Sequence, residues 1–408
     1  MGRKNNVLVG LDIGTTKTTA IVGEVTDTGI DIIGIGTSPA KEMRKGAVVN
    51  IDNMVESIKT AVEEAEHMSG CHINSVYVGI AGNHVKGQNS LGIVSIKGRE
   101  VDEDDVQRAI EASRAIAVPV DREIMHILPQ NYVVDGQDGI KDPKGMSGVR
   151  LEAKVHIVTA SSSAIQNIIK SVSRVGLDID DIVMEQLAAS EALLSSDEKD
   201  LGVAVIDIGG ANTGISIFSE GCIKHTAILP LGGNYVTSDI ATGLRTPLSE
   251  AESIKIKYGC AMTALIPKEE TIQVPSVGGR EDREVSRQIL GRIIEPRIEE
   301  ILSFAFKEIV RAGFEDMLAA GVVVSGGTSL MPGIVELAEQ VFDMPARRGN
   351  PDGVGGLADV VNSPAHAVGV GLIAYGSKHI EGESVYGRKI GIVGRISRSI
   401  KKFISEFF

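Results

Sequence analysis

The sequence predicts an α/β protein built from two related halves that face each other across a cleft. The main observation is an internal repeat. An apolar strand, Asp-Ile-Gly, a small polar turn and a second strand occur at residues 7–25 and again at residues 203–218. The first residues of the two Asp-Ile-Gly motifs, Asp12 and Asp207, are 195 positions apart, which is the scale of a domain. Hydrophobic residues make up 43% of the 408 residues, enough for a large buried core.

The composition excludes several classes of protein. The chain has 41 basic and 54 acidic residues, and the resulting net charge of −13 argues against nucleic-acid binding. Trp is absent and aromatic residues are 3% of the chain, so stacking platforms for single-stranded nucleic acid are not expected. Cys71, Cys222 and Cys260 show no CxxC spacing and favour a reducing, cytosolic compartment. No apolar run reaches the ~18 residues of a membrane span.

Apolar spacing predicts the elements of the first half. Met54, Ile58 and Ala61 recur at helical spacing, whereas the apolar run at 75–81 is typical of a buried strand. Residues 84–160 alternate β-like runs with one helix that starts on acidic residues, and we interpret them as an insertion. The expected elements are strands at 7–13 and 18–25, a helix at 54–66, a strand at 75–81, and helices near 102–115 and at 162–176 and 185–195.

The second half repeats the order of strands and helices. Its longest predicted helix contains Pro296, and the polar, glycine-bearing residues 377–391 are typical of a linker. The expected elements are strands at 203–208 and 214–218, helices at 249–258 and 285–311, a buried strand at 321–325 and the start of a small-residue helix at 364–375.

The two Asp-Ile-Gly turns have the chemistry of phosphate recognition. Glycine lets a turn bring backbone N–H groups close to phosphate oxygens, and hydroxyl and amine side chains add donors. A carboxylate repels phosphate directly, so Asp12 and Asp207 are predicted to hold Mg²⁺ through water. Asp-Gly turns are common in hairpins, so it is the second copy that favours a polyphosphate clamp. The candidate ligands are Gly14, Thr15, Thr16 and Lys17 in the first turn, and Gly209, Gly210, Asn212 and Thr213 in the second.

A third turn follows the buried strand at 321–325. Gly326 and Gly327 let the backbone lie flat against a planar ligand, with Thr328 and Met331 beside them; the alternative is an ordinary strand-to-helix turn. Other sites are not supported, because the sequence contains no GxxxxGK[ST], HExxH or GxSxG motif and no cluster of Cys and His.

In order, these three turns resemble the phosphate-1, phosphate-2 and adenosine motifs of the actin/Hsp70/sugar-kinase ATPase superfamily. The segments 186–189 (Gln-Leu-Ala-Ala) and 367–371 (Ala-Val-Gly-Val-Gly) resemble its two connecting segments. The resemblance implies an actin-like ATPase fold that binds ATP with Mg²⁺. It adds four ATP-binding candidates: Gly232, Gly233, Glu252 and Lys255. For the last two, three apart on a helix, the alternative is a solvated helix face.

Residues 392–408 predict a basic amphipathic helix behind the linker. Residues 388–408 carry a charge of +5, whereas the rest of the chain carries −18. Such a helix is expected to lie in the interface of an anionic membrane. One copy would bind the membrane weakly, and linked copies in a polymer would bind it tightly. The alternative is that the helix docks on the protein's own core. The residues predicted to contact lipid are Ile396, Ile400, Phe403, Ile404 and Phe407 on the apolar face and Arg398, Lys401 and Lys402 opposite.

Over essentially its whole length the sequence resembles the FtsA family of bacterial actin-like cell-division proteins. The segments that carry the resemblance are 147–156, 230–240, 274–280, 294–297 and the basic tail. The resemblance implies an ATP-binding, polymerising protein, peripheral on the cytoplasmic side of the inner membrane at the division site. There it would tether FtsZ filaments and recruit later division proteins. The implied partners are the FtsZ C-terminal peptide, further copies of the chain, those division proteins and anionic lipids.

The resemblance also implies a division into subdomains. These are 1A (1–83 and 161–192), the inserted 1C (84–160), 2A (193–235 and 316–376), 2B (236–315), the linker (377–391) and the membrane-targeting helix (392–408). Subdomain 1C would make filament contacts, and 2B would bind the FtsZ peptide. The candidate surface for that peptide is Glu295, Arg297 and Glu300, for which an ordinary exposed helix face is the alternative.

Catalysis is expected to be slow at most. Related ATPases use a polar residue at the start of the first connecting segment to position water, and Glu185 or Gln186 would do so here, beside Asp12 and Asp207. ATP is therefore predicted to act mainly as a structural ligand that favours polymerisation. Two alternatives remain open: a small-molecule kinase of the same superfamily, and an actin-like scaffold of pilus assembly.

Overall fold

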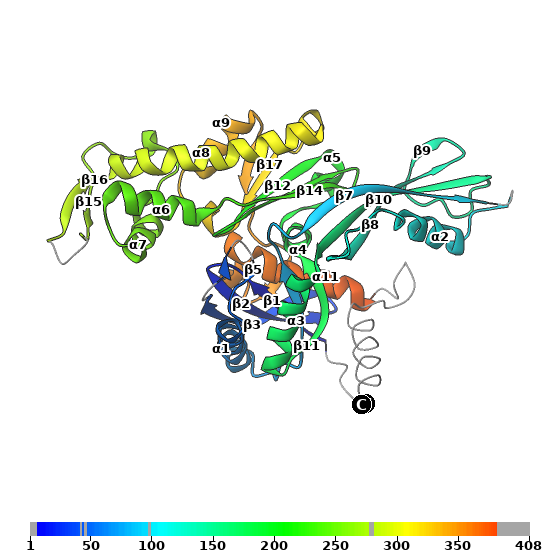
Figure 1. The fold of residues 1–408 in the computed structure, drawn as a ribbon, viewed down its shortest axis with the longest axis horizontal. Coiled ribbons are helices and arrows are strands. Elements are labelled where there is room, and N and C mark those ends of the chain that lie inside the picture. Colours follow the sequence, from blue (N-terminus) through cyan, green and yellow to red (C-terminus); the bar gives the residue numbers. More distant parts are fainter. Residues whose placement is uncertain (1–5, 41–42, 45–46, 97–98, 277–280, 382–408) are drawn as a thin grey trace.

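The computed structural model describes residues 6–40, 43–44, 47–96, 99–276 and 281–381 (Figure 1). The predicted tail helix and most of the predicted linker lie outside these residues. Helix α11 (Ala367–Glu381) continues beyond residue 375, where the sequence predicted the linker to follow. Its glycines let it cross α4 (Glu185–Leu193) closely: a Cβ at Gly371 would lie 1.8 Å from Ala188 O. This crossing lies between the two halves.

The first half is a six-stranded sheet covered on both faces. The side chain of Asn50 caps helix α1 (Ile51–Ser69) by accepting from the N–H groups of Asp52 and Asn53. Helix α1 packs with α3 (Ser162–Val175) on one face, while α11 covers β1 (Val7–Ile13), β2 (Lys17–Thr26) and β6 (Ser75–Ile80) on the other. The strands, in spatial order, are β11 (Asp178–Met184), β6 (Ser75–Ile80), β1 (Val7–Ile13), β2 (Lys17–Thr26), β3 (Gly29–Pro39) and β19 (Val354–Gly356). The other elements are β4 (Met43–Arg44), β5 (Ala47–Val48), α1 (Ile51–Ser69), α3 (Ser162–Val175), α10 (Ala358–Val361) and the 3-10 turn Pro364–His366.

The second half is a five-stranded sheet with a helical extension. The helix predicted around Pro296 runs unbroken as α8 (Arg287–Ala312), and the turn at Gly326 and Gly327 leads through a 3-10 turn to a helix that begins at Ile334. The strands, in spatial order, are β14 (Cys222–Leu229), β13 (Thr213–Ser219), β12 (Val203–Ile208), β17 (Val322–Ser325) and β18 (Ala346–Arg348). The others are α5 (Ser196–Leu201), α6 (Gly233–Leu244), α7 (Leu248–Tyr258), α8 (Arg287–Ala312), α9 (Ile334–Phe342), β15 (Thr271–Val274), β16 (Arg283–Ser286), and 3-10 turns at Thr263–Leu265, Glu315–Met317 and Gly327–Leu330.

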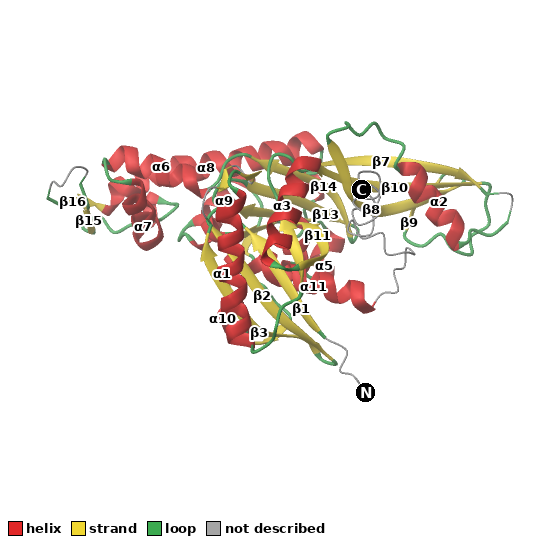
Figure 2. Ribbon diagram, turned by 60° about the horizontal axis from the view of Figure 1, so that its bottom comes forward, coloured by secondary structure: helices red, strands yellow, loops and turns green. Residues whose placement is uncertain are grey.

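The insertion is a separate four-stranded antiparallel sheet that extends away from the first half (Figure 2). Its order is β7 (Lys86–Ser95), β10 (Arg150–Ser161), β8 (Arg122–Val134) and β9 (Gln137–Ile140), with α2 (Glu103–Ser113) on one face. Asp102 and Asp105 form a reciprocal capping box at the start of α2, as expected for an acidic helix start. The α2 backbone packs tightly on β7, because a Cβ at Gly92 would lie 1.9 Å from Ala109 O.

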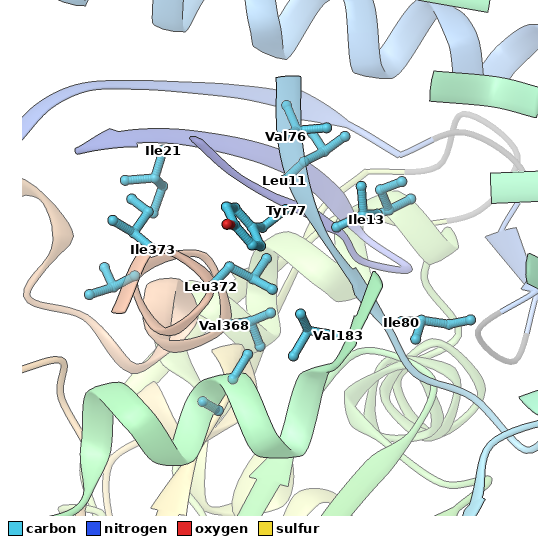
Figure 3. Close-up of a cluster of buried hydrophobic side chains, with 14 of the residues drawn as sticks. Leu11, Ile13, Ile21, Val76, Tyr77, Ile80, Val183, Val368, Leu372 and Ile373 are labelled. Carbon is cyan, nitrogen blue, oxygen red and sulfur yellow. The ribbon is translucent and has the colours of Figure 1, made fainter. Parts of the chain in front are cut away.

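The internal repeat holds the same place in both sheets. β1 pairs antiparallel with β2 and parallel with β6, and β12 pairs antiparallel with β13 and parallel with β17. A large core fills the first half and also includes Val203, Val205, Phe218, Ile223 and Val323 of the second half, and a further core fills the rest of the second half. In the first core, Leu11, Tyr77 and Leu372 bring β1, β6 and α11 together (Figure 3). These apolar layers hold the two Asp-Ile-Gly turns at equivalent positions.

Candidate functional site

The two Asp-Ile-Gly turns face each other between the halves. The first joins β1 to β2, and the second joins β12 to β13 and is closed by a 3.0 Å hydrogen bond from Gly209 N–H to Asn212 O. A Cβ at Gly210 would lie 2.6 Å from Thr16 Cγ2, so the two turns approach each other closely. Glycine at 210 keeps that space open.

Three carboxylates gather behind these turns. Burial raises the pKa of Asp12 to about 6, opposed by the nearby Lys17. Burial raises the pKa of Asp207 to about 7, and the charge of Asp12 adds to the shift. The pKa of Glu185, at the start of α4, lies well above its usual range because of burial and then the charges of Asp12 and Asp207. The negative charges of these carboxylates repel one another, so the cluster favours a bound cation.

This donor set is compatible with Mg²⁺ held through water. Within the described ranges, no group of three or more His, Cys, Asp or Glu side chains is arranged to hold a metal ion directly. Mg²⁺ keeps several waters and is usually held by one or two carboxylates together with phosphate oxygens. Asp12 and Asp207, at the ends of equivalent strands, supply two such carboxylates.

Positive charge at the cleft comes from Lys17 in the first turn. Burial lowers its pKa, and Asp12 opposes this shift. His366, on the turn before α11, was not singled out from the sequence. Its pKa falls to about 4 through burial and then the charge of Lys17, so it is neutral at physiological pH. A lone histidine next to small residues offers no sequence signal for this position.

The first connecting helix separates Glu185 from Gln186. The Gln186 side chain is 3% exposed and turns toward β13, where its Nε2 would lie 2.2 Å from a Cβ at Gly214. Gln186 Oε1 is buried and has no hydrogen-bond partner among the described residues. Glu185 is therefore the residue of this pair that is electrostatically coupled to the carboxylates.

The expected adenosine side is built where α6, α7 and the third turn meet. Gly233 N–H donates to Gly209 O at 2.9 Å, and a Cβ at Gly233 would lie 2.5 Å from Thr328 Oγ1 and 3.4 Å from Lys255 Nζ. Thr328 Oγ1 itself donates to Gly209 O at 3.2 Å. A Cβ at Gly232 would lie 2.6 Å from the same carbonyl. The phosphate-2 turn and the third turn are thus joined directly.

Glu252 and Lys255 form a partly buried pair rather than a solvated helix face. Lys255 Nζ lies 2.7 Å from Glu252 Oε2, and its side chain is 10% exposed. It also donates to Gly233 O at 3.2 Å and to Thr237 Oγ1 at 2.9 Å, and Thr237 donates to Glu252. This network, in which Thr237 was not anticipated, ties α7 to the start of α6.

The remaining candidates of the site have mixed environments. Met331 is 7% exposed and belongs to the second core, close to the end of α7. Thr213 is buried and donates to Leu231 O at 2.8 Å. Gly326 has φ +83°, and a Cβ there would lie 2.5 Å from Asp207 Oδ1, so only glycine suits this approach. Gly327 has open space around its Cα.

The three candidate partner residues on α8 differ in what they contact. Arg297 pairs with Asp239 at 2.6 Å and with Glu300, and its guanidinium lies 5.8 Å from the Tyr235 ring centre. Glu295 instead accepts from Thr263 N–H at 3.1 Å and anchors a 3-10 turn. The candidate lipid-contacting residues lie outside the described residues. Of the helices that are described, none is long and apolar enough to cross a membrane.

Comparison with known sequences gives a consistent result. A family model described as "Cell division protein FtsA" matches residues 204–371, and one described as "SHS2 domain inserted in FTSA" matches residues 82–159. Cell division protein FtsA of Pseudomonas aeruginosa is 52% identical over 94% of this chain and 92% of its own length. The FtsA proteins of Escherichia coli (40%, over 94% of both chains) and Bacillus subtilis (39%, over 95% of this chain and 86% of the relative) are also similar.

Solved structures share the fold at low sequence identity. The PilM-PilN type IV pilus biogenesis complex aligns with a TM-score of 0.67 at 17% identity, covering 90% of this chain and 98% of that one. ADP-bound MreB5 of Spiroplasma citri (TM-score 0.54, 13% identity) covers 92% of this chain and 96% of that one. A MamK double helical filament (0.52, 10%) covers 91% of this chain and 98% of that one. The predicted actin-like fold is confirmed.

Proposed function

Because the chain belongs to the FtsA family of cell division proteins, we propose that it is an ATP-binding, self-associating protein that links FtsZ filaments to the cytoplasmic face of the inner membrane and recruits later division proteins. The observation that carries the proposal is the 52% identity to a cell division protein FtsA over 94% of the chain. The likeness to a pilus complex, at 17% identity, supports the fold alone.

ATP would act mainly as a ligand that holds the halves together. The phosphate-1 turn belongs to the first half, and the phosphate-2 turn, α6, α7 and the third turn belong to the second. Gly14, Thr15, Thr16 and Lys17 would bind phosphates from one side, and Gly209, Gly210, Asn212 and Thr213 from the other. A ligand that contacts both halves stabilises the closed cleft over the open one.

The carboxylates would hold the metal rather than the phosphates. Bound Mg²⁺ would neutralise phosphate charge and relieve the repulsion between Asp12 and Asp207. Asp12 and Asp207 would accept hydrogen bonds from its waters, for which both must be ionised. Glu185 would orient a water beside them, but burial and the charges of Asp12 and Asp207 raise its pKa and favour the protonated form, which is a poor general base. Slow hydrolysis is expected for this reason.

The bound base and ribose would lie on the second half. Gly232 and Gly233 would allow close backbone approach at the start of α6, and Glu252 and Lys255 would contact the ribose side. Gly326, Gly327, Thr328 and Met331 would border the adenine. The Glu252–Thr237–Lys255 network supports this assignment, because it fixes the pair in one geometry before the ligand arrives.

The membrane and FtsZ would be bound at separate places. The tail, residues 392–408, would lie in the anionic interface. The FtsZ C-terminal peptide would bind subdomain 2B on α8 near Arg297 and Glu300. Arg297 is 27% exposed, and its pKa is raised by its hydrogen bond to Asp239. A partly exposed guanidinium held in place by a carboxylate can exchange that partner for an acidic group of a peptide.

Liposome flotation tests this proposal. With anionic liposomes, Mg·ATP and FtsZ, the full chain is expected to float and to carry FtsZ with it. A chain ending at Gly391 is expected to stay in the dense fraction with FtsZ. Arg297→Glu is expected to float but to leave FtsZ behind, whereas the matched control Arg292→Glu, exposed on the same helix, carries FtsZ normally.

The outcomes separate the parts of the proposal. Flotation of the truncated chain would contradict the membrane role of residues 392–408. FtsZ that floats equally with Arg297→Glu would contradict the position of the FtsZ surface. Failure of the full chain to float or to carry FtsZ would contradict the tether itself and favour a soluble kinase, which sugar-dependent ADP release would detect.

A further inference from the structure

The inserted subdomain belongs to the first half by sequence but is hydrogen-bonded to the second half. It leaves the first half after β6, through residues 81–85, and returns at Ser161, directly into α3. In both views its strands β7 and β10 lie alongside β14 of the second half (Figures 1 and 2). The subdomain therefore bridges the two bodies that border the nucleotide cleft.

The contacts with β14 form a polar latch, which we define as Asn89, Gln130, His156 and Thr226. His156 Nε2 lies 2.8 Å from Thr226 Oγ1, and its Nδ1 lies 2.6 Å from Asn89 Oδ1. Asn89 Nδ2 donates to Lys224 O at 3.2 Å, and Gln130 Nε2 donates to Ile223 O at 2.8 Å. These amides satisfy carbonyls of an edge strand that has no neighbouring strand on this side among the described residues.

The centre of the latch is the buried pair of His156 and Thr226, whereas Gln130 is half-buried and Asn89 is exposed. His156 is 1% exposed, and burial holds its pKa at about 4, so it stays neutral and matches one donor and one acceptor. A Cβ at Gly87 would lie 2.1 Å from Thr226 Oγ1, so β7 and β14 are as close as the glycine allows. Breaking the latch would leave buried polar groups without partners.

Attachment to the first half combines a hydrogen bond with apolar packing at the inner end of the subdomain. Val158 and Ala160 of β10 belong to the first core, and Met125 and Leu128 of β8 pack against it. Met184 N–H donates to His126 Nε2 at 3.1 Å, and His126 pairs in the sheet with Val158, three residues before Ser161. Gly82, in the other connector, has φ +134°, a backbone region open mainly to glycine. Short connectors of this kind absorb rotation more readily than a paired sheet does.

We propose that the inserted subdomain moves with the second half when nucleotide closes the cleft, and pivots on the first half at residues 81–85 and Ser161. The nucleotide state then sets the direction in which the subdomain presents its outer surface. This inference rests on the proposed function, because it requires nucleotide to change the angle between the halves. It goes further by assigning the subdomain to the second half as a rigid body.

Distances between three exposed labels test it. Spin labels at Gln137 in the subdomain, Lys59 in the first half and Glu299 in the second are introduced in pairs into the full chain with Cys71→Ser, Cys222→Ser and Cys260→Ala. On adding Mg·ATP, the Lys59–Glu299 and Gln137–Lys59 distances are expected to shift together. The Gln137–Glu299 distance is expected to stay constant.

A latch variant sharpens the test. In Asn89→Ala/Gln130→Ala/Thr226→Val, the Gln137–Glu299 distance is expected to broaden and to change with nucleotide. The control Gln88→Ala, an exposed amide on the same strand, is expected to behave like the parent chain. Circular dichroism on each variant shows whether it is folded. If the triple variant does not fold, the three distances measured in the chain with an intact latch still test the proposal.

The opposite pattern would overturn the proposal: a constant Gln137–Lys59 distance with a changing Gln137–Glu299 distance places the subdomain with the first half. Unchanged distances in all three pairs, in a chain that binds a fluorescent ATP analogue, would overturn it as well. A chain that does not bind the analogue at all would contradict the proposed function, and this binding measurement keeps the two failures distinguishable.

Discussion

The two Asp-Ile-Gly hairpins have the same backbone plan but a different chemistry. In the first, Asp12 lies near the ammonium of Lys17, and the turn contributes charge. In the second, Asp207 lies near Asp12 without a comparable cation, and its pKa is higher, about 7 against about 6. The second turn contributes backbone instead: its carbonyls at Gly209 and Gly210 accept from the first N–H groups of α6.

This difference shows how a duplicated motif can divide one task. In the proposed function, the first hairpin would supply a long-range attraction for phosphate, which depends on salt and on a single side chain. The second hairpin supplies shape, because its glycines hold α6 and the third turn at fixed distances. Substitutions in the first are expected to act through charge, and those in the second through steric exclusion.

The largest expected effect is steric and falls on the second hairpin. In Gly210→Val, the added carbons would meet Thr16 Cγ2, 2.6 Å from the Cβ position, and fill the space between the turns. ATP affinity is expected to fall by about 100-fold or more, equivalent to roughly 2.7 kcal/mol. Isothermal titration with Mg·ATP measures this. The matched control is Gly209→Ala, whose Cβ would meet only Asn212 O at 3.2 Å; retained affinity in Gly210→Val would remove Gly210 from the site.

The next effect is electrostatic and falls on the first hairpin. Lys17→Met is expected to weaken ATP binding by about tenfold, roughly 1.4 kcal/mol, and to flatten its dependence on salt. Asn212→Ala, at the corresponding place in the second turn, is expected to change affinity less and to keep the salt dependence. Fluorescent-ATP titrations at several salt concentrations check both variants. Equal losses in the two variants would show that the hairpins do not divide the task.

The smallest effect concerns stability without nucleotide. The folded-state pKa of Asp207, about 7, lies above its unfolded value of about 3.9, so its stabilising contribution is present at low pH and is lost as pH rises from about 4 to 7. Asp207→Asn is therefore expected to stabilise the nucleotide-free protein at pH 8 by about 1 kcal/mol. Asp12→Asn is expected to stabilise the protein by less than Asp207→Asn does, because it also leaves Lys17 without its carboxylate. Urea unfolding at pH 5 and pH 8 measures the difference, and a gain for Asp207→Asn that is the same at both pH values would contradict the assignment to charge burial.

Local patterns predicted much of the fold. The apolar spacing at 54–66 and 162–176 identified α1 and α3, and the buried run at 321–325 identified β17. Helix and strand periodicities depend only on residues that are close together in the sequence, so local patterns suffice to predict them. The same patterns did not predict β3 or α6, nor the 3-10 turn that separates Gly327 from α9. Paired glycines there permit either a helix or a 3-10 turn, and packing against Gly209 decides between them.

The sequence by itself determined the repeat, the positions of the two turns and the family, because each depends on residues close together in the chain or on identity along it. Only the tertiary structure decided that Glu185 rather than Gln186 is coupled to the carboxylates, that His366 lies near Lys17 and that Arg297 pairs with Asp239. It also revealed the latch between β14 and a subdomain inserted about 70 residues or more earlier. Such contacts join segments far apart in sequence, and the packing of helix and sheet faces that creates them leaves no local signal.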